Sequence, residues 1–291
     1  MSETTFTHGT WLSADGLTLS YTEYPGNNDH PPILCIPGLT RNARDFEPIA
    51  DAFAGEWRVI CPDLRGRGLS DYAKDPASYT PETYVDDIEA LLEQLGLEKV
   101  VVIGTSLGGI VTMLLAARNP APLAGVVLND IGPMIEAAGI DRIREYVGQG
   151  RTFPTWMHAA RAMKDTAGAA HPDFDISDWL TLSKRLMCLS GNGRITFDYD
   201  MKIADNFETV PEGPQVDMWQ AYRALSGRPV LAIRGQLSDL LSETTLARMS
   251  REIPDVETIT VPRVGHTPML SEEVAQSAIA RLLARVSAAQ N

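Results

Sequence analysis

The sequence has few cysteines and no concentration of positive charge. Its 291 residues include 3 cysteines, which lie far apart without a C-x-x-C pair, so a disulfide-rich scaffold is excluded. Lysine and arginine total 25 against 38 aspartates and glutamates, a formal net charge of −13, and no basic run occurs. An acidic surface repels phosphate backbones and anionic lipids, so we expect neither nucleic acid nor a membrane as a partner.

Motifs for cofactors and for export are also missing. The sequence contains no H-x-x-H, H-E-x-x-H or cysteine cluster, and no G-x-G-x-x-G or phosphate loop follows a predicted strand. We therefore expect no metal and no nucleotide cofactor. Residues 1–5 carry neither a basic start nor an apolar segment. That pattern predicts no secretory signal, and hence a cytoplasmic protein.

Short apolar strands alternate with helical segments along most of the chain. A hairpin with an Asp15-Gly16 turn is predicted within residues 10–24. Further strands are predicted at 33–36, 58–61, 100–103, 125–128, 230–233 and 258–261, and helices at 46–53, 83–95, 107–118 and 272–286. This alternation predicts an α/β fold with a mostly parallel, doubly wound sheet.

The alternation stops after the sixth predicted strand. Residues 134–214 show helical patterns only, for example at 155–164 and at 178–189, the second with Ser177 as its N-cap. We therefore predict a core domain of residues 1–133 and 215–291, with a helical cap of residues 134–214 inserted after strand 6. The cap should fold over the carboxyl edge of the sheet, where open α/β sheets bind ligands.

The strongest local signal is Gly104-Thr105-Ser106-Leu107-Gly108-Gly109. It matches G-x-S-x-G and lies between a predicted strand and a predicted helix, the context in which this motif marks a nucleophile. The turn is so tight that bulky neighbours would collide, which explains the flanking glycines. Ser106 then lies at a helix N-terminus, where free N–H groups favour developing negative charge. The pattern predicts Ser106 as a catalytic nucleophile.

A serine nucleophile needs a base, and the base needs a carboxylate that orients it. Among 5 histidines, only His266 lies on a loop after a predicted strand near the end of the chain, where it could reach Ser106. Two acids follow strands in suitable places, Asp130 and Asp239. The chain order Ser, Asp, His holds for both, so order does not discriminate between them.

Four segments together resemble one family. Residues 104–109, 62–71 (PDLRGRGLSD), Asp239 and 265–268 (GHTP) are similar to the α/β-hydrolase fold superfamily, in its serine-nucleophile branch with a helical cap. That branch contains esterases, lactonases and carbon–carbon bond hydrolases. The resemblance covers residues 19–284 and implies this fold, a catalytic triad and hydrolase chemistry.

The resemblance also implies an oxyanion hole built from two backbone N–H groups, those of Leu39 and Leu107. The chain departs from the common family pattern at Pro37, where a histidine is usual, and at Arg67, which we interpret as structural. A serine at the elbow excludes the aspartate-nucleophile dehalogenases and epoxide hydrolases of this fold, so acyl chemistry is indicated.

For the orienting carboxylate we favour Asp239. It lies several residues past its strand, in a loop long enough to approach the base, and 27 residues before His266. Asp130 follows its strand by only two residues and leads directly into the predicted cap, so we interpret it as a structural acid. The predicted triad is therefore Ser106, His266 and Asp239.

The cap is rich in aromatic residues and methionines, most of which should form its own core. Phe153 and Trp156 are candidates for the roof of a pocket, and Arg41 is a candidate for an anionic substrate group. These features predict a serine hydrolase that cleaves a carboxylic ester of a small, largely apolar or aromatic substrate. Alternatives are a carbon–carbon bond hydrolase or lactonase for ring-cleavage products, and a ligand receptor that keeps the fold. We expect a small-molecule substrate as the partner and a monomer or homodimer.

Overall fold

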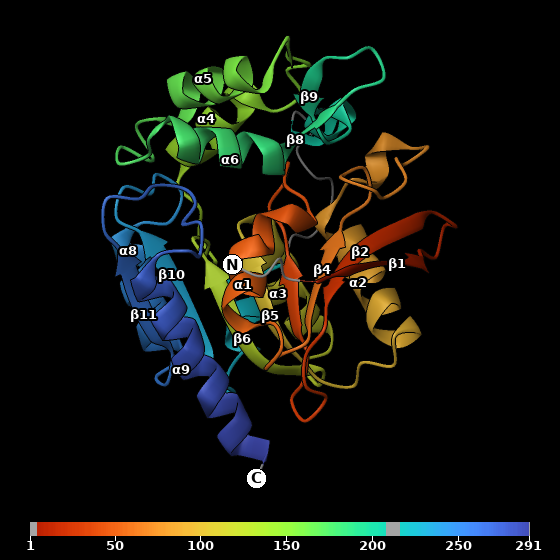
Figure 1. Cartoon of the computed structure of the whole chain (residues 1–291). Coiled ribbons are helices and arrows are strands. Elements are labelled where there is room, and N and C mark those ends of the chain that lie inside the picture. The colour runs from red at the N-terminus through yellow and green to blue at the C-terminus, as the bar shows by residue number, and fades with distance from the viewer. Residues whose placement is uncertain (1–4, 208–215, 291) are drawn as a thin grey trace.

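A single eight-stranded sheet forms the centre of the molecule, in a computed structural model that describes residues 5–207 and 216–290 (Figure 1). The strand order is β1-β2-β4-β3-β5-β6-β10-β11. The strands are β1 (Thr7–Leu12), β2 (Thr18–Tyr24), β3 (Ile33–Ile36), β4 (Val59–Asp63), β5 (Val100–Thr105), β6 (Leu123–Asn129), β10 (Val230–Gly235) and β11 (Glu257–Val261).

Within this sheet, β4, β3, β5, β6, β10 and β11 run parallel, and β2 is the strand that runs in the opposite direction. β1 pairs with β2, and β2 pairs with β4, in antiparallel register. β5 lies between β3 and β6 and all six of its residues are buried, as expected for a β-branched strand that is covered on both faces. The carboxyl ends of β3, β5, β6 and β10 therefore meet at one edge of the sheet.

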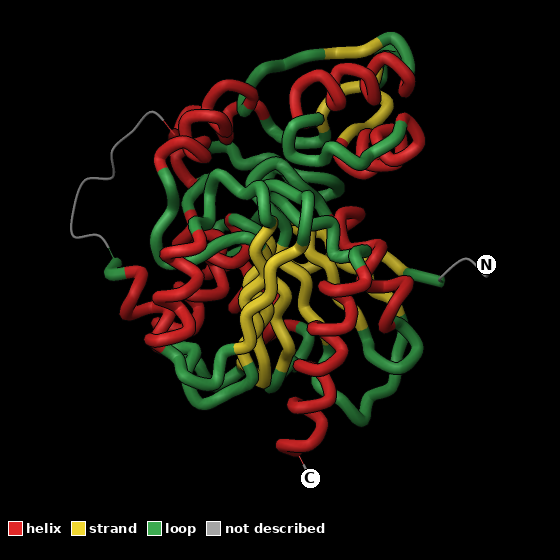
Figure 2. Tube along the Cα trace, turned by 90° about the vertical axis from the view of Figure 1, so that its left-hand side faces the viewer, coloured by secondary structure: helices red, strands yellow, loops and turns green. Residues whose placement is uncertain are grey.

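Helices cover both faces of the sheet (Figure 2). One face is covered by α1 (Glu47–Phe53) and α9 (Glu273–Gln290), whose apolar side chains share a core with β3 and β4. The other face is covered by α2 (Pro81–Gln94), α3 (Leu107–Arg118), α7 (Met218–Arg223) and α8 (Glu243–Glu252). The predicted doubly wound, mostly parallel α/β sheet is confirmed.

Residues 137–207 form a separate layer beyond the carboxyl ends of the strands, which we call the cap (Figures 1 and 2). Its elements are α4 (Ala137–Tyr146), β7 (Thr152–Phe153), α5 (Trp156–Ala167), α6 (Ile176–Leu186), β8 (Met187–Leu189), β9 (Ile195–Phe197) and the 3₁₀ helix η3 (Met201–Phe207). Two shorter 3₁₀ helices, η1 (Ala43–Phe46) and η2 (Pro76–Ser78), belong to the core. Residues 208–214 of the predicted cap lie outside the described residues.

The prediction that the cap is purely helical is wrong. β7, β9 and β8 form a three-stranded antiparallel sheet, and the helix expected at 178–189 ends at Leu186 because the chain turns into β8. The N-cap of that helix is Asp175 and not Ser177. Asp175 accepts from the backbone of Asp178, whose side chain accepts from the backbone N–H of Asp175, which is a capping box.

Among the residues that the structure describes, no helix is both long enough and apolar enough to cross a bilayer.

Candidate active site

Ser106 lies on a strained turn between β5 and α3. Its backbone has φ of 52° and ψ of −116°, a left-handed conformation that non-glycine residues rarely adopt. The neighbouring glycines leave no room for a side chain. A Cβ on Gly108 would lie 2.0 Å from the carbonyl oxygen of Ile36, and one on Gly104 would lie 2.6 Å from that of Gly108. The G-x-S-x-G spacing therefore reflects the close packing of this turn.

His266 joins Ser106 to Asp130 through two hydrogen bonds. The Ser106 Oγ lies 2.9 Å from Nε2 of His266, and Nδ1 of His266 lies 2.7 Å from Oδ2 of Asp130. An ionised carboxylate can only accept, so Nδ1 carries the proton and Nε2 is the acceptor for the serine hydroxyl. The His266 side chain is 7% exposed and that of Asp130 is fully buried. This arrangement can remove the hydroxyl proton of Ser106 and stabilise the resulting imidazolium.

The expectation that Asp239 orients His266 is wrong, because the structure gives this place to Asp130. The Asp239 carboxylate instead forms a bidentate pair with Arg142 of α4, at 2.5 and 2.9 Å. The hydrogen bonds from Arg142 lower the pKa of the Asp239 carboxyl below its usual value. Asp239 therefore joins the core to the cap.

The loop that follows β10 explains why Asp130, and not Asp239, is hydrogen-bonded to His266. Ser238, the residue before Asp239, turns toward Asp130 and donates its hydroxyl to Oδ2 at 2.7 Å. The backbone N–H of Gly235 donates to Oδ1 of Asp130 at 2.8 Å. Asp130 itself has φ of 53°, and this conformation turns the chain after β6. The end of β10 and the loop after it thus donate hydrogen bonds to Asp130, which follows β6, and do not themselves provide the carboxylate that is hydrogen-bonded to His266.

The two expected oxyanion donors flank Ser106. Leu39 lines the cavity beside the serine, and Leu107 begins α3. Neither backbone N–H makes a hydrogen bond within residues 5–207 and 216–290, so both donors are available. Gly38 brings this loop close to the nucleophile, since a Cβ on it would lie 3.6 Å from the Cβ of Ser106.

Arg67 holds the loop that carries Leu39. Its guanidinium is fully buried and donates to the carbonyl oxygens of Leu39 and Arg65 at 2.9 and 2.6 Å and to the Tyr84 hydroxyl at 2.9 Å. It also lies 4.8 Å over the Tyr84 ring. No carboxylate pairs with it among the described residues, and its Nη2 has no partner there. Arg67 therefore has a structural role, because it fixes the loop that carries Leu39.

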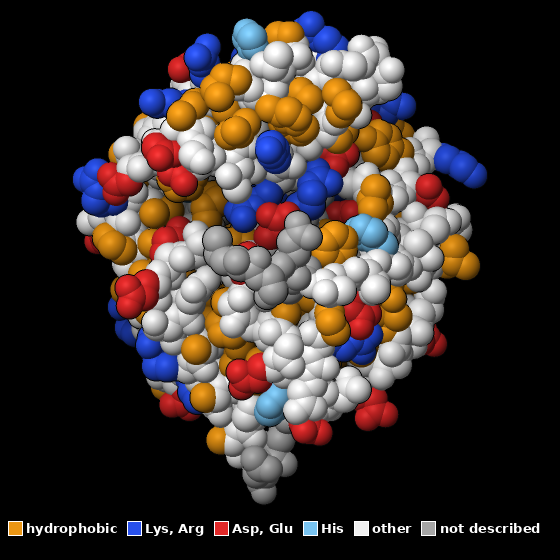
Figure 3. Space-filling model, in the orientation of Figure 1, with side chains coloured by type: hydrophobic (Ala, Val, Ile, Leu, Met, Phe, Trp, Pro, Cys, Tyr) orange, Lys and Arg blue, Asp and Glu red, His pale blue; other side chains and the backbone are white. Residues whose placement is uncertain are grey.

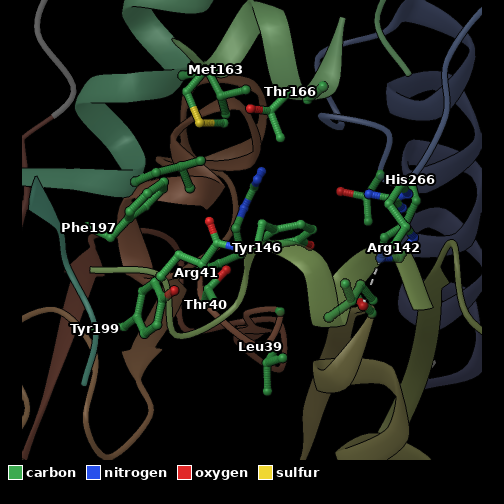
Figure 4. A pocket seen from close by; sticks show the side chains of 18 of the residues that line it. Leu39, Thr40, Arg41, Arg142, Tyr146, Met163, Thr166, Phe197, Tyr199 and His266 are labelled. Carbon is green, nitrogen blue, oxygen red and sulfur yellow. Dashed lines mark hydrogen bonds between the residues drawn. The ribbon is translucent and has the colours of Figure 1, made fainter. Parts of the chain in front are cut away.

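Ser106 lines a cavity of about 270 Å³ between the core and the cap (Figure 4). Leu39, Thr40 and Arg41 line it from the core, and Met163, Thr166, Phe197 and Tyr199 line it from the cap. Of the substrate candidates predicted from the sequence, Arg41 and Phe153 line this cavity. Trp156 is not among the residues that line it, and its half-buried side chain packs against the hydrophobic core of the cap. The assignment of Trp156 to the pocket is therefore wrong.

His171 is a cavity residue that the sequence did not indicate. It lies in the cap loop between α5 and α6, is 4% exposed, and stacks on Phe174 at 4.6 Å. Its Nδ1 has no partner within the described residues. Burial, with smaller effects of Arg41 and His266, lowers the pKa of His171 to about 4. The ring is therefore neutral at pH 7.

No group of three or more histidine, cysteine, aspartate or glutamate side chains in the described part of the chain is arranged to hold a metal ion.

Comparisons with known proteins agree with this geometry. The family model described as the alpha/beta hydrolase fold matches residues 31–273. The chain is 35% identical over 278 residues to 3-hydroxybutyrate-oligomer hydrolase from Cupriavidus necator, which covers 92% of this chain and 94% of that protein. It is 28% identical over 255 residues to 2-(acetamidomethylene)succinate hydrolase from Mesorhizobium japonicum, covering 87% and 88%.

A solved structure is more similar still. The crystal structure of an α/β hydrolase from Novosphingobium aromaticivorans matches with a TM-score of 0.92 and 56% sequence identity, over 96% of this chain and 98% of that one. The family match, the doubly wound sheet and the serine on its strained turn lead to one assignment. The chain belongs to the α/β-hydrolase fold family and is a hydrolase.

Proposed function

We propose that this hydrolase cleaves the carboxylic ester of a small, largely apolar substrate through an acyl-enzyme on Ser106. The observation that carries the proposal is the hydrogen-bonded chain from Ser106 through His266 to Asp130, at the floor of the cavity. A serine so placed attacks carbonyl carbon, and an ester supplies both a carbonyl and a leaving alcohol.

The first half of the reaction forms the acyl-enzyme. His266 takes the hydroxyl proton of Ser106 at Nε2 while Oγ attacks the ester carbonyl. The tetrahedral oxyanion accepts hydrogen bonds from the N–H groups of Leu39 and Leu107, which have no other partner among the described residues. The intermediate then collapses, and the alcohol leaves with the proton that His266 returns to it.

The second half releases the acid. A water molecule gives its proton to Nε2 of His266 and attacks the acyl carbonyl, and the same two N–H groups hold the second oxyanion. Collapse frees the carboxylic acid and returns the proton to Ser106. Throughout, Asp130 holds the proton on Nδ1 and balances the charge of the imidazolium.

The size of the cavity and the names of the relatives narrow the substrate class. About 270 Å³ is near the lower end of small-molecule sites, which favours short esters over long-chain lipids. The relative named for 3-hydroxybutyrate oligomers is similar over nearly the whole of both chains. A short hydroxy-acid ester is therefore the substrate to test first.

The test is a turnover panel with purified protein and its Ser106→Ala variant. The panel contains 4-nitrophenyl acetate and butyrate, a linear 3-hydroxybutyrate dimer, a γ-lactone and a vinylogous diketone. We expect sustained turnover of the esters that Ser106→Ala abolishes. Preferential cleavage of the diketone or the lactone would replace the ester proposal with carbon–carbon or lactone hydrolysis. A single acylation without turnover would instead indicate a receptor.

A further inference from the structure

The cavity is lined by basic side chains although the protein as a whole is acidic. The formal net charge is −13, yet the charged residues that line the cavity are Arg41, Arg142, Arg151 and a single acid, Glu145. Lysine and arginine side chains gather around the hollow beneath the cap, with acidic side chains beside them (Figure 3). A purely apolar ester would gain nothing from this arrangement, because each arginine loses hydration next to it.

Arg41 and Arg142 reach the cavity from different parts of the molecule. Arg41 belongs to the core loop after β3, whereas Arg142 belongs to α4 of the cap. Each is fixed by one carboxylate that does not line the cavity. Asp45 accepts from Nε and Nη2 of Arg41 at 2.8 and 2.9 Å, and Asp239 accepts from the same two atoms of Arg142. Both guanidinium groups are therefore held in place before any ligand binds.

These pairs leave donors for a ligand. A guanidinium has five N–H groups, and a bidentate carboxylate uses two of them, so Nη1 of Arg41 and of Arg142 is not taken by Asp45 or Asp239. Arg41 and Arg142 line the same cavity as Tyr146 and His171. Both arginines thus belong to the wall of one cavity, which also contains His171, whose Nδ1 has no partner among the described residues.

We infer that the substrate carries a carboxylate, which binds between Arg41 and Arg142 while its ester carbonyl lies at Ser106. The inference rests on the proposed function. Each arginine already holds one aspartate, so the pair suits a single added negative charge better than a phosphate dianion. Ile143, Leu182 and Leu186 line the same cavity and accommodate the carbon chain between the two ends of the substrate.

The first experiment compares two esters with the same acyl chain and leaving group, one with a free carboxylate and one in which a methyl group caps that carboxylate. Mono-4-nitrophenyl glutarate is anionic, and methyl 4-nitrophenyl glutarate is its neutral counterpart with the same leaving group. We expect kcat/KM to favour the anionic ester on the order of ten- to a hundredfold, the range of a charge-assisted hydrogen-bonded pair. Added salt should reduce this preference. Equal kcat/KM for the two esters would overturn the inference.

The second experiment removes the cation without leaving its partner unpaired. The double variant Arg142→Gln/Asp239→Asn deletes one whole ion pair, and Arg41→Gln/Asp45→Asn deletes the other. Each should lower the anionic-to-neutral ratio about tenfold. Arg144→Gln is the matched control, since Arg144 lies exposed on the same helix and does not line the cavity. A ratio that stays at the parent value in both double variants would refute the assignment of these arginines.

A binding measurement separates this inference from the proposed function. Calorimetry with the Ser106→Ala protein records binding of glutarate, of its neutral dimethyl ester and of inorganic phosphate. If the parent protein hydrolyses no ester while the Ser106→Ala protein binds glutarate, the proposed function is overturned and the anion site is supported. If the parent protein hydrolyses esters but glutarate does not bind, the proposed function is supported and the anion site is overturned. Tighter binding of phosphate than of glutarate would overturn the carboxylate assignment.

Discussion

Asp130→Asn should abolish most of the turnover although it changes only one atom of the side chain. The amide oxygen of asparagine can still accept from the N–H of Gly235, so its NH₂ group faces Nδ1 of His266. Nδ1 must then be the acceptor, which moves the proton to Nε2. A protonated Nε2 cannot accept the hydroxyl proton of Ser106. The expected cost in kcat is about 10³–10⁴, or roughly 4–5.5 kcal/mol of activation free energy.

The matched variant is Asp239→Asn, which conserves size and removes the same charge from the neighbouring loop. Its lost partner is Arg142, and both side chains are 34% exposed, so the pair contributes little to stability. We expect kcat on the neutral ester 4-nitrophenyl butyrate to fall far less than in Asp130→Asn. Stopped assays at pH 7.5 measure kcat, and circular dichroism with thermal melting establishes that both variants are folded. A folded, active Asp130→Asn beside an inactive Asp239→Asn would show that the acid is Asp239.

The remaining predictions concern the cavity and its supports. Because burial lowers the pKa of His171 to about 4, the unfolded chain takes up a proton below pH 6.5 that the folded chain does not bind. Stability should fall by about 3 kcal/mol between pH 6.5 and pH 4, and denaturant melts should show a smaller fall in His171→Gln. Arg67→Met frees the carbonyl of Leu39, so kcat on all esters should drop about tenfold with KM little changed; a rise in KM alone would argue against a role for Arg67 in the oxyanion loop. Phe153→Ala should alter the preference among acyl lengths and Trp156→Ala should not, as kcat/KM across an ester series will show.

The nucleophile and the base could be predicted because their signals are local. A Cβ on Gly104 would meet the backbone of the same turn and one on Gly108 would meet the backbone of β3, so both glycines are required and mark Ser106 in the sequence. The loop of His266 follows the last strand directly. The acid that is hydrogen-bonded to His266 could not be predicted in this way. The choice of acid depends on whether Ser238 or Asp239 turns inward, and a shift of one residue in a loop reverses that choice without any change in sequence pattern. Spacing along the chain does not determine this direction.

The core of the fold followed from periodicity, whereas the cap did not. Buried strands such as β5, which begins with the β-branched run of residues 100–103, stand out in the sequence. The cap strands have two or three residues each, too few to show an alternation, and they form because the chain pairs with itself over α5 and α6. Composition alone does not show whether Trp156 of α5 faces the pocket. The side of α5 that faces the cavity is set by packing between helices.

The central claim is that Ser106 becomes acylated, and active-site labelling tests it most directly. The protein is treated with a fluorophosphonate, digested and mapped by mass spectrometry, with Ser106→Ala as the control. We predict one adduct per chain, on the peptide that contains Ser106, forming in step with the loss of ester turnover and absent from the variant. An adduct on a different serine, or full loss of activity without modification of Ser106, would contradict the account.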